Sequence, residues 1–188
     1  MKQALVTIVG KDRPGIVHRV SQVLASQGCH ITGLSQTTLL GQFAGLFSTK
    51  VPNELNQEKL SQALEKSLAD TSLSFWIAPP SEEELFQVVS SEPYVITMRG
   101  PDRPDIIPSV TKTVASFDAN IENLRAVTIS AGDNLQEAQP PLVLVLEIAV
   151  PIMVQQNAFR QALSLTAEEL GIEIGLQHRD IFEAIHRV

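Results

Sequence analysis

The residues best suited to chemistry form a short turn near the start of the chain. The segment Gly10-Lys11-Asp12-Arg13-Pro14-Gly15-Ile16 follows an apolar run and precedes residues with helical periodicity. Glycine lets a backbone approach another group closely, and the unpaired amides at a helix start favour an anion such as a carboxylate. Asp12 could accept from an ammonium group, so the turn would suit the zwitterion of a free amino acid. The candidate ligand-binding residues are Gly10, Lys11, Asp12, Arg13, Gly15 and Ile16.

A purely structural interpretation of the same turn stays open. Asp12 is a good N-cap candidate, because its carboxylate can accept from the first amides of a helix. Pro14 suits the first helical turn, where its missing N–H is not needed. Taken alone, the turn could be no more than a well-capped helix start.

The turn occurs twice, because the chain repeats itself 90 residues later without a gap. The segment Thr7–Leu34 aligns with Thr97–Leu124. The identical pairs include Gly10 with Gly100, Asp12 with Asp102, Arg13 with Arg103 and Ile16 with Ile106. A repeat of this length can fold around a core of its own, which indicates a duplicated domain and not a solenoid unit. We expect a first domain over residues 1–78, a linker over 79–92 and a second domain over 93–188.

Each half predicts the order β-α-β-β-α-β from its apolar periodicity and its turn residues. In the first half the expected strands are Ala4–Val9, His30–Leu40, Gln42–Val51 and Thr71–Ala78, with one helix after Pro14 and another around Leu60–Leu68. In the second half they are Tyr94–Arg99, Asn120–Ser130, Leu142–Val150 and Ile172–His178, with helices around Ile106–Val114 and Phe159–Leu170. This order predicts an α+β protein of two ferredoxin-like βαββαβ domains, each a four-stranded antiparallel sheet with its helices on one face.

Three features go beyond the simple duplication. The second hairpin is longer and holds a polar loop at residues 131–141, which is either a lid or docking element or a tolerated surface insertion. The tail Asp180–Val188 has the apolar spacing of a closing helical turn. Strands such as Leu142–Val150 are apolar on both faces, so we expect the other half of the chain or a second copy to cover the open face of the sheet. The alternative is that these are merely central strands with additional valines.

Composition excludes several classes of function. The net charge is −7 without a basic stripe, which argues against direct binding to nucleic acid. The longest apolar run, Pro140–Val154, is too short to span a bilayer, and no targeting sequence opens the chain, so a soluble cytoplasmic protein is expected. Cys29 is the single cysteine and is expected to be a small buried apolar residue. The four histidines show no close metal-ligand spacing, and neither a metal nor a cofactor is expected.

The turn sequence, the element order and the module size together resemble the ACT domain family. The segment GKDRPGIV followed by GCHI, the tandem arrangement and the long second hairpin are similar to the glycine cleavage system transcriptional repressors within it. The resemblance implies small regulatory modules that bind amino acids where paired copies meet, with glycine or serine favoured here. It also implies a protein partner, a transcription regulator, as well as pairing of the two domains and formation of homo-oligomers.

The resemblance places a second, weaker site in the second turn. Its residues would be Gly100, Asp102, Arg103, Asp105 and Ile106. Asp105 stands where the family has glycine, and its carboxylate would repel an anionic ligand group. The first turn is therefore expected to be the better site.

Two other function classes remain as alternatives. An enzyme is disfavoured, because two modules and a linker use up the chain and no nucleophile motif is present. A ligand-free protein–protein adaptor, or a regulatory subunit of an amino-acid metabolic enzyme, would explain the apolar sheet faces and the acidic second half.

Overall fold

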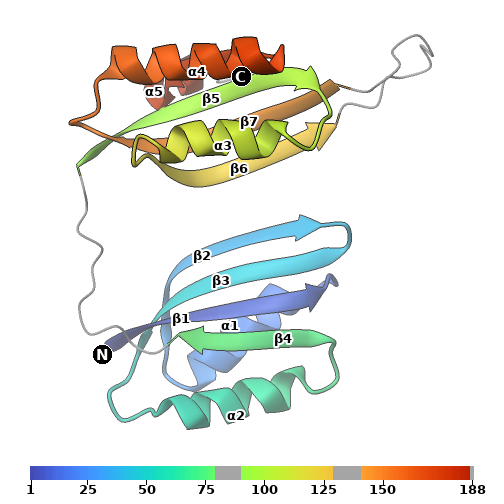
Figure 1. The fold of residues 1–188 in the computed structure, drawn as a ribbon. Coiled ribbons are helices and arrows are strands. Elements are labelled where there is room, and N and C mark those ends of the chain that lie inside the picture. Colours follow the sequence, from blue (N-terminus) through green and yellow to red (C-terminus); the bar gives the residue numbers. More distant parts are fainter. Residues whose placement is uncertain (79–89, 129–140, 187–188) are drawn as a thin grey trace. The chain divides into compact units, whose positions relative to one another are not determined.

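The computed structural model of the chain describes residues 1–78, 90–128 and 141–186 (Figure 1). It divides into two units, Met1–Phe86 (unit 1) and Gln87–Val188 (unit 2). The polar loop predicted at residues 131–141 lies outside the described residues except for Pro141. Most of the segment predicted as a linker, residues 79–89, also lies outside them.

Unit 1 contains a four-stranded antiparallel sheet and two helices. The strands are β1 (Lys2–Lys11), β2 (His30–Leu39), β3 (Gln42–Val51) and β4 (Leu73–Ala78), and the helices are α1 (Ile16–Ser26) and α2 (Gln57–Leu68). The spatial order is β2-β3-β1-β4, so β2 and β4 are the edge strands. The β2–β3 hairpin closes through Leu40 and Gly41, whose φ angles of 49° and 72° match the left-handed positions of a tight two-residue turn.

Both helices of unit 1 pack on the same face of its sheet. Burial alternates along β3, where Phe43, Gly45 and Phe47 are buried on the side of the helices and Ala44 and Leu46 point away from them. The buried cluster combines these rings with Val6 and Ile8 of β1 and with the apolar stripes of α1 and α2. This is the arrangement that the period of two in the strands and of 3.6 in the helices requires.

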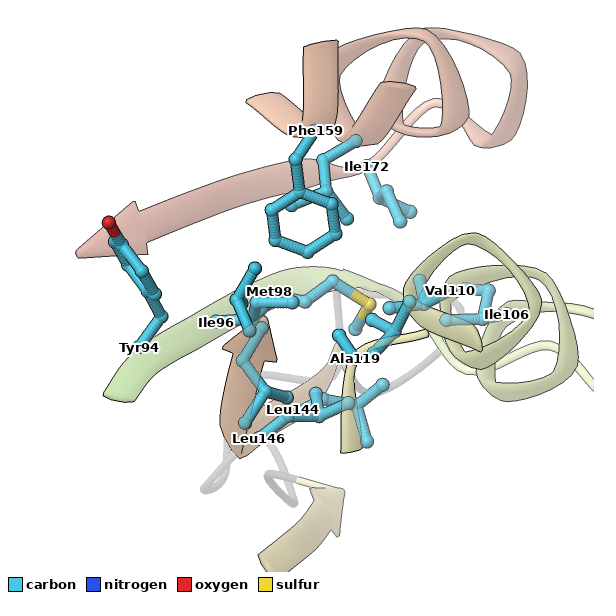
Figure 2. Close-up of a cluster of buried hydrophobic side chains, with 14 of the residues drawn as sticks. Tyr94, Ile96, Met98, Ile106, Val110, Ala119, Leu144, Leu146, Phe159 and Ile172 are labelled. Carbon is cyan, nitrogen blue, oxygen red and sulfur yellow. The ribbon is translucent and has the colours of Figure 1, made fainter. Parts of the chain in front are cut away.

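Unit 2 repeats this architecture and adds a helix. Its strands are β5 (Ser91–Pro101), β6 (Asn120–Thr128), β7 (Pro141–Pro151) and β8 (Glu173–His178), and its helices are α3 (Ile106–Ala115), α4 (Gln156–Leu170) and α5 (Arg179–His186). The sheet order β6-β7-β5-β8 corresponds to that of unit 1. Its core includes Ile96, Met98 and Phe159 (Figure 2), and Phe117 meets Phe159 edge to face with ring centroids 5.1 Å apart.

The predicted fold class is confirmed, since both halves have the order β-α-β-β-α-β and the tail forms the helix α5. Strand β5 begins at Ser91, inside the residues assigned to the linker. The assignment of Asp12 as N-cap and of Pro14 to the first helical turn is wrong. Helix α1 begins at Ile16, its N-cap residue is Gly15, and no side chain of the described residues caps it.

Gly10 and Gly100 have a packing role that follows from their neighbours. A Cβ atom on Gly10 would lie 2.4 Å from the backbone oxygen of Ser72 and 2.9 Å from the Cα of Leu73. A Cβ atom on Gly100 would lie 2.4 Å from the Cγ2 of Ile172, which is a side-chain atom. The first glycine of each turn therefore lets the chain at the start of that unit's last strand lie close to it. In unit 1 the nearest neighbours are backbone atoms, and in unit 2 they are side-chain atoms.

Gly10→Ala is expected to destabilise unit 1 by about 1–3 kcal/mol, the range for forcing an extra carbon into a packed site. The unfolding of unit 1 can be followed by the fluorescence of Trp76, the single tryptophan of the chain, during urea denaturation. Gly100→Ala is the matched control and should move the Trp76 midpoint less, because its clash is in unit 2. An unchanged midpoint for Gly10→Ala would contradict the steric argument.

Candidate functional site

The turn between β1 and α1 leaves the start of the helix open. Gly15 has φ 90° and ψ 0°, a left-handed conformation that strains any residue with a Cβ atom. The first intrahelical bond is donated by the amide of Arg19 to the Gly15 carbonyl at 2.9 Å. The preceding amides, those of Ile16, Val17 and His18, therefore have no carbonyl available within the helix. These amides can donate to an anion.

Asp12 is held by the neighbouring hairpin and not by the helix. Its amide donates to the Gly41 carbonyl at 2.8 Å, and its Oδ2 accepts from the Thr38 hydroxyl at 3.5 Å. Both contacts come from the β2–β3 hairpin. The carboxylate of Asp12 is thus placed beside the edge strand β2, where it can accept from a bound cationic group.

An open pocket of about 410 Å³ lies between this turn and β2. Its lining residues are Asp12, Arg13, Gly15, Ile16, Val17, His18, Gln36, Thr38 and Phe43. The structure therefore brings together the predicted residues Asp12, Arg13, Gly15 and Ile16. Gly10 and Lys11 do not line this pocket, and Gly10 instead packs against β4.

Sequence reasoning missed the wall that β2 and β3 contribute to this pocket. This wall consists of Gln36, Thr38 and Phe43. Of these, Thr38 could have been found from the sequence repeat. The repeat places Thr128 at the corresponding position, and its hydroxyl contacts Oδ2 of Asp102 at 3.3 Å. The Thr–Asp contact is thus duplicated together with the turn.

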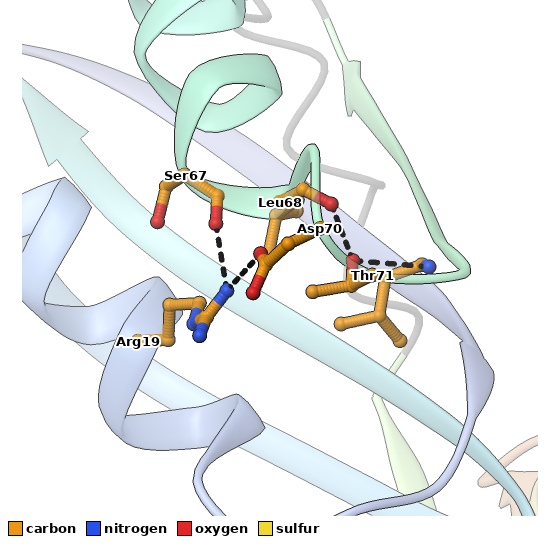
Figure 3. A network of polar contacts seen from close by, with 6 residues as sticks. Arg19, Ser67, Leu68, Asp70 and Thr71 are labelled. Atoms are coloured by element: carbon orange, nitrogen blue, oxygen red, sulfur yellow. Dashed lines mark hydrogen bonds and ion pairs between the residues drawn. The ribbon is translucent and has the colours of Figure 1, made fainter.

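A second pocket, of about 310 Å³, lies on the other side of the helix start. It is lined by Arg13, Pro14, Gly15, Ile16, His18, Arg19, Gln22 and Leu73. Arg19 is fixed there, because it donates to the Ser67 carbonyl at 3.0 Å and forms an ion pair with Asp70 (Figure 3). The hydrogen bond from Arg19 lowers the pKa of the Asp70 carboxyl below its ordinary value of 3.8.

The turn of unit 2 has different backbone geometry. Asp105 is the N-cap residue of α3, with φ −85° and ψ −15° in place of the left-handed glycine. Its carboxylate accepts two hydrogen bonds from Arg103, at 3.1 and 3.0 Å, and these bonds lower its pKa. Arg103 therefore offsets part of the negative charge of Asp105, which we expected to repel an anionic ligand group.

The start of α3 also offers fewer donors than that of α1. Pro108 occupies the position that corresponds to His18 and has no backbone N–H. The side chain of Asp105 adds bulk where Gly15 leaves open space, since a Cβ on Gly15 would meet nothing within 4 Å. Both differences leave more free amides and more open space at the first turn than at the second.

The single cysteine of the chain lies in the core of unit 1. Cys29 is buried, and burial raises the pKa of its thiol, as expected of a small apolar core residue. Among the described residues, no group of histidine, cysteine and carboxylate side chains is arranged to hold a metal ion. No helix in that part of the chain is long and apolar enough to cross a membrane.

Comparisons with known proteins agree with this architecture. The family model of the ACT domain matches the chain twice, over residues 2–76 and 92–177. A UPF0237 protein of Methanopyrus kandleri is 32% identical over 94 residues, which are 50% of this chain and 96% of that relative. The relative thus has about the length of one unit.

Two solved structures match both units of the chain. An unknown protein of Galdieria sulphuraria has a TM-score of 0.80 at 25% identity and covers 94% of this chain and 98% of its own. A protein described as a glycine cleavage system transcriptional repressor has a TM-score of 0.67 at 16% identity. The match covers 94% of this chain and 96% of that protein. At 16% identity the second likeness shows the fold alone.

Asp70→Asn is expected to reduce the stability of unit 1 at neutral pH but not in acid. The pKa of Asp70 is lowered in the folded state, so its ion pair stabilises the fold above pH 3.8 and this contribution is lost as the pH falls through the folded pKa. Urea denaturation of both proteins across this range, followed by Trp76 fluorescence, measures the difference. Asp118→Asn, which removes an exposed carboxylate from unit 2, should keep the wild-type pH dependence. A wild-type–variant difference that stays constant into acid would contradict the assignment.

Proposed function

The chain belongs to the ACT domain family, and we propose that it is a non-catalytic regulatory protein that binds a small free amino acid. The ligand occupies the pocket of about 410 Å³ between the β1–α1 turn and β2 of unit 1. Ligand pockets in proteins span roughly 300–1,000 Å³, so the size is appropriate.

The observation that carries this proposal is the uncapped start of α1 beside a fixed carboxylate. The amides of Ile16, Val17 and His18 would donate to the ligand carboxylate, and Asp12 would accept from its ammonium group. Thr38 and the Gly41 carbonyl hold Asp12 in place, so the site is organised before the ligand arrives. Amide donors beside a carboxylate would favour a zwitterion over a simple anion.

The lining supports a small polar amino acid, with glycine and serine favoured. Gln36 and Thr38 provide polar side chains on β2, and Phe43 limits the pocket on the side of the core. The turn of unit 2 is proposed as the weaker site, at Gly100, Asp102, Arg103, Asp105 and Ile106, because Asp105 and Pro108 reduce its donors and its space.

Binding would be coupled to a protein partner, which we propose to be a transcription regulator of amino-acid or one-carbon metabolism. This part rests on the resemblance of the first turn to glycine cleavage system repressors and on the fold likeness to a protein described as one. Coupling requires that the amino acid bind with different affinity to the free protein and to its complex. The second candidate, a ligand-free adaptor or a regulatory subunit of a metabolic enzyme, is favoured by the exposed apolar side chains of unit 1.

Asp12→Ala is expected to weaken the binding of glycine or serine by roughly 10- to 150-fold, the range for losing a hydrogen bond to a charged group. Isothermal titration calorimetry on the full chain measures the affinity. Asp102→Ala, the same change in unit 2, is the matched control and should keep the affinity of the first site.

The outcome of a full amino-acid panel separates the two candidate functions. Heat release with one or a few amino acids, lost in Asp12→Ala, supports the sensor. A wild-type protein that binds none of the twenty amino acids would refute it and favour the ligand-free adaptor.

A further inference from the structure

The sheet of unit 2 is covered on both of its faces. Ile96 and Met98 of β5 belong to the core that α3 and α4 close, so the residue before them, Val95, points to the opposite side, which we call the outer face. Val95 is only 2% exposed, whereas its counterpart in unit 1, Leu5, is 36% exposed. Helix α5 contacts β5 and β8, and we attribute the burial of Val95 to it.

Arg179, the first residue of α5, ties this helix to the outer face. Its guanidinium forms ion pairs with Glu122 of β6 and, at 3.7 Å, with Glu147 of β7. Glu147 is paired with Val95 across the strands, so both side chains lie on the outer face. The side-chain amide of Asn123 donates to Glu147 at 3.0 Å and holds this carboxylate in place. One guanidinium therefore connects the start of α5 to two strands.

The acidic anchor for this arginine is specific to unit 2. Glu122 is the extra residue of a β-bulge in β6, a feature that re-aims a side chain. Unit 1 has the same bulge in β2, but Thr32 takes the place of Glu122 and Ser48 that of Glu147. The hydroxyls of Thr32 and Ser48 contact each other at 3.0 Å. An arginine at the corresponding position of unit 1 would find no carboxylate in either place.

Apart from its arginine, α5 has a weak hold on the sheet. It has 8 residues, fewer than the about 12–15 that an isolated helix needs to be even marginally stable. Ile181 is 56% exposed and Phe182 is half-buried. The Nε of Arg179 is buried and has no hydrogen-bond partner among the described residues. A buried unpaired donor costs free energy, and this cost is relieved when the arginine returns to water.

We propose that Arg179, Glu122 and Glu147 form an electrostatic latch that holds α5 on the outer face of unit 2, and that α5 leaves this face as a unit when the latch opens. The three side chains are 27%, 44% and 39% exposed, so dissolved salt can screen their attraction. In the open state Arg179 keeps Glu183 beside it, four residues along the same helix. Opening exposes Val95 next to two carboxylates, so α5 is an autoinhibitory contact that closes this face.

A thiol placed under α5 measures the opening directly. Val95→Cys in the full chain puts this thiol on the outer face, and iodoacetamide, which is uncharged, reacts with it only when α5 is displaced. The wild-type chain, whose Cys29 is buried, gives the background rate. The labelling rate of the introduced thiol should rise as sodium chloride is increased from about 0.1 M to about 1 M, because the screening length falls from roughly 10 Å to roughly 3 Å.

Removing the cation tests the assignment of the latch. Arg179→Met, added to Val95→Cys, should raise the labelling rate at low salt by roughly 5- to 30-fold and should abolish its dependence on salt. Glu122→Gln should give a smaller increase, because Glu147 still pairs with the arginine. Arg125→Met, which removes an exposed arginine from β6 of the same sheet, is the matched control and should change neither the rate nor its salt dependence.

A second thiol separates the release of α5 from the unfolding of unit 2. Ala119→Cys lies in the core on the helix side of the sheet, and its labelling should be unaffected by Arg179→Met. Equal acceleration at Ala119→Cys and Val95→Cys would mean that the whole unit unfolds, and the proposal would be wrong. It would also be overturned by a Val95→Cys rate that ignores salt and Arg179→Met, by a salt dependence that persists in Arg179→Met, or by a thiol that is fully reactive at low salt.

Discussion

The functional argument depends on the backbone conformation of one residue, Gly15. With φ at 90°, it lets the chain leave β1 and enter α1 without placing any side chain over the first turn of the helix. The free amides that result can donate to an anion at this point. The β2–β3 hairpin then adds the carboxylate of Asp12, so the proposed recognition of a zwitterion rests on one glycine and one hairpin.

The sequence predicts the fold well because the patterns that determine it are local. Apolar periodicity located the strands and helices of both units, and each half gave the same element order. The helix start was predicted less well, because Asp12 and Pro14 are ordinary cap residues in isolation. Only the structure shows that the Asp12 amide is bonded to Gly41, a contact that local sequence does not encode. Phe43 and Gln36 were missed for the same reason, since their place in the pocket depends on strand pairing.

Duplication has produced two units with one architecture and different surfaces. Each keeps the Thr–Asp contact beside its turn, at Thr38 and at Thr128. Unit 1 keeps the open helix start, whereas unit 2 has Asp105 and Pro108 at its helix start and α5 against its sheet. Unit 1 thus keeps free amides at the start of its first helix, whereas unit 2 has fewer donors there and carries an additional helix against its sheet.

The most direct test is a titration of the isotopically labelled full chain with glycine and serine, followed by amide nuclear magnetic resonance. The account predicts that the largest shifts occur at the amides of Gly15, Ile16, Val17 and His18, with smaller shifts for Gln36 and Thr38 across the pocket. Shifts confined to unit 2, or shifts elsewhere in unit 1 with the start of α1 unaffected, would contradict the claim that the uncapped helix start is the ligand site.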